Sequence, residues 1–133
     1  MENALIALGL ILFTLGLLTG LVVPRMRNPR MGVASHLEGV TNGAFLIVVG
    51  LIRLHLGHTL KIIVVVLLAY STYANWFSTQ LAALWGAGRR FAPIAAGDHR
   101  ATPMRERLID GLLMTLAPAI IGTCIILLIG LLR

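Results

Sequence analysis

Four long apolar runs dominate the sequence, and three connections that contain most of the charges separate them. A helix of ~20 apolar residues crosses the roughly 30 Å hydrocarbon core of a bilayer. Apolar residues fill each run instead of alternating with polar ones, which favours spanning helices over barrel strands. The pattern predicts one domain, residues 1–133, with spans at about 4–23, 35–56, 59–85 and 108–132. The expected fold is an all-α, integral membrane four-helix bundle.

The composition excludes a water-soluble domain. Hydrophobic residues make up 58% of the chain and charged residues 12%, whereas a soluble domain has about 25% charged residues. The net charge of +6 does not indicate nucleic-acid binding, because the basic residues lie at the ends of apolar runs and form no basic helix face. We therefore expect membrane lipid, and no nucleic acid, as a partner.

The basic residues also predict an orientation. Eight of the eleven Lys and Arg residues lie in the connections 24–34 and 86–107. The positive-inside rule places such connections in the cytoplasm, with both termini on the far side. The sequence thus predicts a multi-pass protein of the inner (plasma) membrane, with loops 24–34 and 86–107 cytoplasmic.

Small residues indicate where helices approach closely in lipid, because the hydrophobic effect does not drive their association there. Glycines suited to such contacts occur in three of the four spans: Gly9, Gly16 and Gly20, then Gly39 and Gly43, then Gly122 and Gly130. Four short helices enclose little interior of their own, so we expect a homo-oligomer.

The second span carries polar residues that need an explanation. Glu38 and Asn42 share one helix face, since a helix turns by about 100° per residue. His36 lies with Gly39 and Gly43 on nearly the opposite face. An imidazole beside a smooth glycine surface suits a flat ligand. The alternative is that His36 lies at headgroup level and merely begins the helix.

Glu38 lies about one turn inside the predicted span. An unpaired carboxylate at that depth costs on the order of several kcal/mol, so it needs a partner or a role. Two interpretations remain open: a structural ion pair with Arg27 or Arg30, and a role in proton transfer.

The third span is unusually polar. It has a polar stripe and an adjoining aromatic one, formed by Ser71, Asn75 and Ser78 and by Tyr70, Tyr73 and Phe77. Such stripes serve helix–helix hydrogen bonds and core packing, or they bind a small aromatic substrate that bears one polar group. The remaining histidines, His55, His58 and His99, are too scattered for a zinc site.

One stretch resembles the hydroxylaminobenzene mutase family: N-P-R-M-G-V-A-S-H-L-E-G-V-T-N-G-A-F-L at Asn28–Leu46, preceded by L-L-T-G-L-V. A more distant similarity is to styrene oxide isomerase, a small four-helix membrane protein. That family is trimeric and holds haem b between neighbouring subunits. The resemblance therefore implies a homotrimer with haem b as its iron cofactor.

Two sequence motifs of the isomerase match residues of this chain. Its haem-ligating histidine and an active-site asparagine six residues later match His36 and Asn42, and an A-N pair of its third helix matches Ala74 and Asn75. The chain departs from the isomerase at three positions, where an acidic residue, a tyrosine and a glycine are replaced by Ser71, Thr79 and Glu38. The resemblance thus favours the mutase over the epoxide isomerase.

The implied reaction converts an arylhydroxylamine, hydroxylaminobenzene, to an ortho-aminophenol by intramolecular hydroxyl transfer. Ferric haem b would act as a Lewis acid towards the leaving oxygen. The resemblance assigns the iron to His36, and the smooth helix surface beside it makes Gly39 and Gly43 the other expected cofactor-binding residues. In the mechanism that we expect, Glu38 transfers the proton, and Asn42 and Asn75 orient the N–OH group.

Tyr70, Tyr73 and Trp76 are the candidates for packing the substrate's aromatic ring. Two other functions fit the same residues. One is a styrene-oxide-type isomerase that turns an epoxide into an aldehyde. The other is a haem-binding or structural membrane subunit without catalysis.

Overall fold

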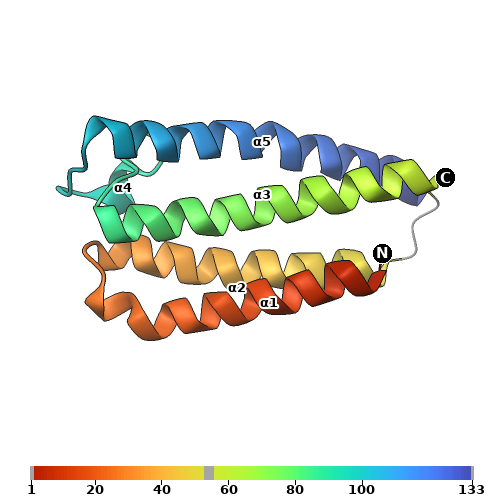
Figure 1. Ribbon diagram of the computed structural model, residues 1–133, viewed down its shortest axis with the longest axis horizontal. Helices are drawn as coiled ribbons and strands as arrows, with labels where there is room; N and C mark the ends of the chain where they lie inside the picture. The colour runs from red at the N-terminus through yellow and green to blue at the C-terminus, as the bar shows by residue number, and fades with distance from the viewer. Residues whose placement is uncertain (1, 53–55, 133) are drawn as a thin grey trace.

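Four long helices run side by side in the computed structural model, which describes residues 2–52 and 56–132 (Figure 1). They are α1 (Glu2–Val22), α2 (Pro29–Leu51), α3 (His58–Trp85) and α5 (Pro103–Leu132). A 3-10 turn η1 (Val23–Arg25) and a short helix α4 (Pro93–Ala96) lie in the connections, and the described part of the chain contains no strand. All four long helices are long and apolar enough to cross a membrane. The all-α fold with four spanning helices is confirmed.

The α1 and α3 helices begin and end within two residues of the predicted spans, but α2 and α5 begin earlier than expected. The α2 helix also ends at Leu51, before the predicted end at 56, because the backbone is extended at Ile52. The α2 helix begins at Pro29 because Asn28 caps it: the Asn28 side chain accepts a hydrogen bond from the Met31 backbone N–H at 3.2 Å. The α5 helix likewise begins at a proline, Pro103. Hydropathy alone missed both first turns because they carry polar residues.

Both arginine-rich connections lie at one end of the molecule, and the start of α1 and the end of α5 lie at the other (Figure 1). The connections are joined by Asn28, which is fully buried. Its side-chain amide donates to the Ala95 carbonyl at 2.9 Å, and its backbone N–H donates to the Ala83 carbonyl at 2.9 Å. One residue thus ties the start of α2 to the end of α3 and to α4.

The α1 and α2 helices pack backbone to backbone through their glycines. A methyl group on Gly16 would lie 2.5 Å from the Val40 nitrogen, and one on Gly43 would lie 2.5 Å from the Phe13 nitrogen. No side chain fits at such distances, so the predicted close contacts of α1 and α2 are present within one chain.

The α3 helix packs on α2, and α5 packs on α3. No comparable contact joins α5 to α1 or α2 in the described residues, so the helices form a layered arrangement and not a closed bundle (Figure 1). Many large apolar side chains remain exposed, among them Leu21, Ile121, Leu128 and Leu132. Lipid or another protein chain must cover this surface.

Candidate functional site

Glu38, Asn42 and Asn75 come together between α2 and α3, and we call these three residues the carboxylate–amide cluster. The Asn42 side-chain amide donates to Glu38 Oε2 at 3.1 Å, and the Asn75 amide donates to the same oxygen. All three side chains are half-buried. The predicted sharing of one face by Glu38 and Asn42 is present, and the contact with Asn75 crosses between helices.

The register of α2 against α3 brings Asn75 to Glu38. Ser35, one turn before Glu38, is fully buried and donates to Gln80 Oε1 at 2.8 Å and to the Trp76 carbonyl at 3.4 Å. These bonds hold the two helices in one register beside the cluster. Sequence reasoning missed the Ser35–Gln80 pair, although both are polar residues inside apolar spans.

No arginine pairs with Glu38 in the described residues, where the ion pair is Arg90 with Asp110 at 3.8 Å. Arg27 instead donates to the carbonyls of Trp85 and Arg100. The ion-pair interpretation of Glu38 is therefore wrong for this chain. Its Oε2 accepts two N–H groups while Oε1 accepts none from the described residues, so one carboxylate oxygen is available to a ligand or a proton.

His36 lies well inside α2, about two turns after its first residue Pro29, so it does not merely begin the helix. Its Nδ1 is 2.8 Å from the Gly16 carbonyl oxygen, and its ring packs against Gly20. A carbonyl acceptor at this distance fixes the Nδ1–H tautomer, which leaves the Nε2 lone pair for a metal. Nε2 has no hydrogen-bond partner in the described chain. The donor chemistry of His36 therefore fits a residue that would hold a haem iron through Nε2.

Gly39 and Gly43 do not offer a free surface beside His36. A methyl group on Gly39 would collide with Gly16, and one on Gly43 would lie 2.7 Å from the Gly9 carbonyl oxygen. The α1 backbone fills the space that a flat ligand would need. The two glycines therefore do not fit a cofactor-binding surface while α1 is in place.

His36 and the carboxylate–amide cluster lie on different sides of α2. His36 and Glu38 are two residues apart, which separates them by about 160° around a helix. His36 faces α1, where it meets Gly16, whereas Glu38 meets Asn75 on α3. One chain alone does not bring these two groups together.

The predicted substrate-packing residues Tyr70, Tyr73 and Trp76 do share a groove, which we call the aromatic groove. Its volume is about 300 Å³, and it is lined by Tyr70, Tyr73, Ala74, Trp76, Phe77 and Leu112. The Tyr73 hydroxyl donates to the Leu8 carbonyl on α1 at 2.8 Å. The Tyr70 hydroxyl lies 2.6 Å from Thr115 Oγ1 on α5.

The aromatic groove lies on the side of α3 opposite to the carboxylate–amide cluster. Asn75 stands two residues from both Tyr73 and Phe77, hence about 160° from each around the helix. The expectation that the aromatic stripe and the polar residues form one pocket is therefore wrong within a single chain. The hydroxyl groups of the other polar-stripe residues, Ser71 and Ser78, donate to backbone carbonyls of α3 itself. The hydroxyl of the neighbouring Thr79 does the same.

Phe45 is the aromatic side chain that shares the face of Glu38, two turns further along α2. It borders a groove of about 260 Å³ whose other lining residues are Val49, Ile52, Cys124, Leu127, Leu128 and Leu131. Sequence reasoning missed Phe45, although its spacing of seven residues from Glu38 placed it on the same face.

The other histidines form no metal site in the described residues, which contain no group of three or more His, Cys, Asp or Glu suited to a metal ion. His58 is exposed at the start of α3, and His99 Nδ1 lies 3.2 Å from the Ala96 carbonyl oxygen. His55 lies outside the described residues.

Comparison with known proteins extends the resemblance from residues 28–46 to the whole chain. A family model described as styrene oxide isomerase matches residues 1–132. Hydroxylaminobenzene mutase HabA of Ectopseudomonas oleovorans is 56% identical over 135 residues, which cover 100% of both chains. Hydroxylaminobenzene mutase HabB of the same organism is 48% identical over 98% of this chain and 81% of its own length. No solved structure matches this chain.

Proposed function

This chain belongs to the styrene oxide isomerase family, and we propose that it converts an arylhydroxylamine such as hydroxylaminobenzene to an ortho-aminophenol within the membrane. The two similar mutases support this substrate class. In the reaction an N–O bond breaks and a C–O bond forms at the ortho carbon. That carbon loses a proton and the nitrogen gains one, so the atoms balance without an oxidant, a reductant or a second substrate.

The observation that carries the proposal is the carboxylate of Glu38, held at one oxygen by two amides and open at the other. The open Oε1 takes the proton that the ring carbon loses and returns a proton to the nitrogen. Asn42 and Asn75 fix the carboxylate through their N–H groups. The side-chain Oδ1 atoms of Asn42 and Asn75 have no donor in the described residues, so they can accept hydrogen bonds from the substrate's N–OH group.

Phe45 is the aromatic side chain best placed to contact the substrate's ring. It lies about one turn from Asn42 along the same face of α2 and is half-buried. The α2–α5 side is open, because α5 packs on α3 and not on α2. An apolar substrate can therefore reach the cluster from the lipid, and the surrounding side chains keep water from the reactive intermediate.

His36 would hold haem b through Nε2, with Nδ1 bound to the Gly16 carbonyl. When bound, a ferric haem supplies a Lewis acid for the oxygen that leaves the nitrogen. Because His36 and Glu38 lie on different sides of α2, a site that uses both takes His36 from one copy and Glu38 from another. We accordingly propose a homo-oligomer, and by family resemblance a homotrimer.

The protein is a multi-pass membrane protein, and we propose the inner (plasma) membrane with the arginine-rich end in the cytoplasm. Reporter fusions after Arg90 should report cytoplasm, and fusions at the C-terminus the opposite side. A cytoplasmic C-terminus would reverse the proposed orientation.

The deciding experiment compares Glu38→Gln with Glu38→Asp and with a control, Asp98→Asn, whose carboxylate is exposed in the distant connection. Hydroxylaminobenzene is the substrate, aminophenol is quantified, and turnover is normalised to folded protein. Glu38→Gln should lose about 10²- to 10⁴-fold, as expected for a general acid–base group, whereas Glu38→Asp should lose less and Asp98→Asn nothing.

Turnover of Glu38→Gln within about threefold of the wild type would show that Glu38 does not transfer a proton in the reaction. Faster conversion of styrene oxide to its aldehyde than of hydroxylaminobenzene would instead favour the epoxide isomerase. A protein that binds haem and converts neither compound would act as a haem-binding subunit.

Haem ligation is tested separately by His36→Ala, with His58→Ala as the control because His58 is exposed and lies at the start of α3, beyond the opposite end of α2 from His36. Purified wild type and His58→Ala should carry the same haem absorbance per protein, and His36→Ala should lose it. Unchanged spectra in both variants would refute His36 as the ligand.

A further inference from the structure

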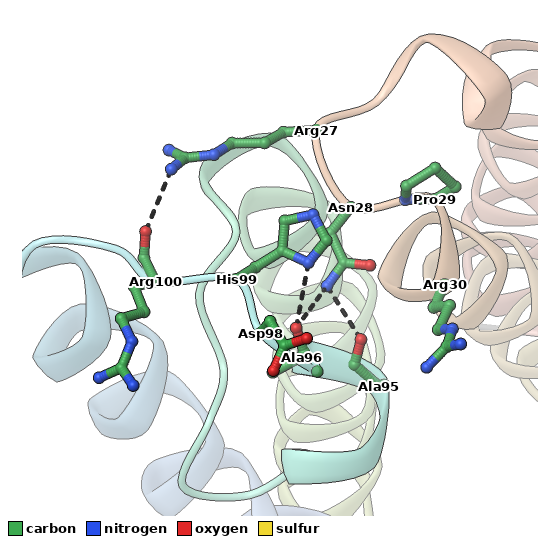
Figure 2. A pocket seen from close by; sticks show the side chains of 10 residues that line it. Arg27, Asn28, Pro29, Arg30, Ala95, Ala96, Asp98, His99 and Arg100 are labelled. Carbon is green, nitrogen blue, oxygen red and sulfur yellow. Dashed lines mark hydrogen bonds between the residues drawn. The ribbon is translucent and has the colours of Figure 1, made fainter.

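A large open cavity lies at the arginine-rich end of the molecule, away from the carboxylate–amide cluster. Its volume is about 780 Å³, and it is lined by Arg27, Asn28, Pro29, Arg30, Ala95, Ala96, Gly97, Asp98, His99 and Arg100. Figure 2 shows Arg100 and Arg30 on opposite sides of His99 and Asn28. The cavity therefore combines the start of α2 with the connection that contains α4.

The positive charge of this cavity is only partly compensated within the described chain. Three guanidinium groups line it against the single carboxylate of Asp98, and none of the three has an ion-pair partner among the described residues. Arg27 donates to the Trp85 carbonyl at 3.0 Å and to the Arg100 carbonyl at 3.2 Å (Figure 2). Neutral carbonyls hold this side chain in place and leave its charge available to an anion.

The backbone and side chains around the cavity are closely packed. Asn28 is fully buried, and its amide donates to the Ala95 carbonyl while its backbone joins the end of α3. Gly86 ends α3 with a φ of 69°, and a methyl group there would lie 3.2 Å from His99 Cβ and 3.3 Å from Arg27 Nε. Arg27 and His99 are thus positioned before any ligand arrives.

The same region also carries apolar side chains suited to the membrane. Ile94 on α4 is 88% exposed, and Phe91 just before it is 48% exposed. Trp85 at the end of α3 has the Arg105 guanidinium 5.2 Å from its ring centroid, an arrangement typical of the membrane–water interface. An anion that binds between these apolar groups and the arginines has its charge at headgroup depth.

We propose that this cavity binds the phosphodiester headgroup of an anionic phospholipid. Basic pockets at the cytoplasmic ends of spanning helices bind such headgroups by charge-assisted hydrogen bonds. The phosphate occupies the cavity that Arg27, Arg30 and Arg100 line from different sides, and the acyl chains extend past Ile94 into the bilayer. The bound lipid holds the two arginine-rich connections together, in addition to the hydrogen bonds of Asn28.

The test measures lipid binding to the purified full chain and not its turnover. Delipidated protein is titrated with phosphatidylglycerol or phosphatidylcholine, and bound lipid is counted by native mass spectrometry. Phosphatidylglycerol should bind in preference to phosphatidylcholine. Arg30→Gln/Arg100→Gln should weaken its binding by about 30-fold, whereas the control Arg89→Gln/Arg107→Gln, with the same change in charge outside the cavity, should not. Arg27 is left intact because it also holds the connection.

Three outcomes would overturn the proposal. Equal binding of the two lipids would show that the headgroup charge is not recognised. Equal loss in both double variants would indicate general surface charge and no site. Displacement of phosphatidylglycerol by millimolar inorganic phosphate, with phosphate bound alone at the same stoichiometry, would identify a free-anion site. None of these outcomes depends on the activity of Glu38.

Discussion

The helix pairs α1–α2 and α3–α5 are both antiparallel neighbours, but they are held together differently. In α1–α2 the glycines of each helix meet the backbone of the other, so no side chain lies between Gly16 and Gly39. In α3–α5 side chains meet, as where the Tyr70 hydroxyl of α3 lies 2.6 Å from Thr115 Oγ1 of α5. Around Gly122 there is no atom within 4 Å of the place of a methyl group.

The difference shows that a glycine in an apolar span is not in itself evidence of a contact. Gly16 and Gly39 face each other at one level of two adjacent helices, whereas Gly122 has no partner helix in the described chain. The closely packed pair carries His36 and Glu38, whose geometry matters for chemistry. The α5 surface is free for lipid or for another copy.

The largest effect on stability is expected from Gly39→Ala, because its methyl group would collide with the Gly16 backbone and force α1 and α2 apart. Overpacking of this kind costs about 1–3 kcal/mol. Gly122→Ala has open space at its methyl group, and alanine favours a helix by roughly 0.8–1.0 kcal/mol over glycine. Thermal unfolding of both variants in one detergent measures the difference.

The expected result is a clear drop in Tm and in folded yield for Gly39→Ala, with no drop for Gly122→Ala. An equal loss of stability in both would mean that Gly122 packs against another copy as closely as Gly39 packs against α1. That outcome would identify α5 as an oligomer interface.

Much of the fold could be predicted from the sequence, because hydropathy and length determine which segments cross a membrane. The starts of α2 and α5 could not, since they depend on the Asn28 cap and on Pro103, where the residues are polar. Helical periodicity correctly placed Glu38 and Asn42 on one face. Periodicity predicts which residues share a face of one helix. It does not predict which neighbouring helix that face contacts.

The candidate site illustrates that limit. The contact between Glu38 and Asn75 depends on the register of α2 against α3, which the Ser35–Gln80 bond fixes. The aromatic stripe of α3 was expected beside the polar residues, but Tyr73 faces α1 instead. Adjoining stripes on one helix can meet two different neighbours, and only the packing of the other helices decides which.

A comparable effect, on turnover and not on stability, is expected from Asn75→Ala, which removes one of the two amides on Glu38 Oε2. A hydrogen bond to a charged group contributes about 1.5–3 kcal/mol, so turnover should fall by roughly 10- to 100-fold. Ser78→Ala is the matched control, because Ser78 lies on the same helix and donates only to the Asn75 carbonyl. Steady-state turnover of hydroxylaminobenzene measures both variants.

A loss confined to KM, with kcat unchanged, would contradict a role of Asn75 in positioning the Glu38 carboxylate and would leave it as a binding group. A comparable loss in Ser78→Ala would mean that both variants act through the stability of α3. Unfolding curves of the two variants separate these outcomes.

The smallest effects are expected from Tyr73→Phe and Tyr70→Phe, which remove the hydroxyl bonds from α3 to the Leu8 carbonyl and to Thr115. Hydrogen bonds between spanning helices contribute about 0.6 kcal/mol on average, so each Tm should fall only slightly. Tyr73→Phe loosens α3 from the closely packed pair, and its loss should exceed that of Tyr70→Phe, whose side chain is 42% exposed. Turnover should stay within about threefold of the wild type, because both rings lie across α3 from Asn75. Tenfold slower turnover at unchanged stability would show that the substrate occupies the aromatic groove, and the side of α3 proposed for the chemistry would then be wrong.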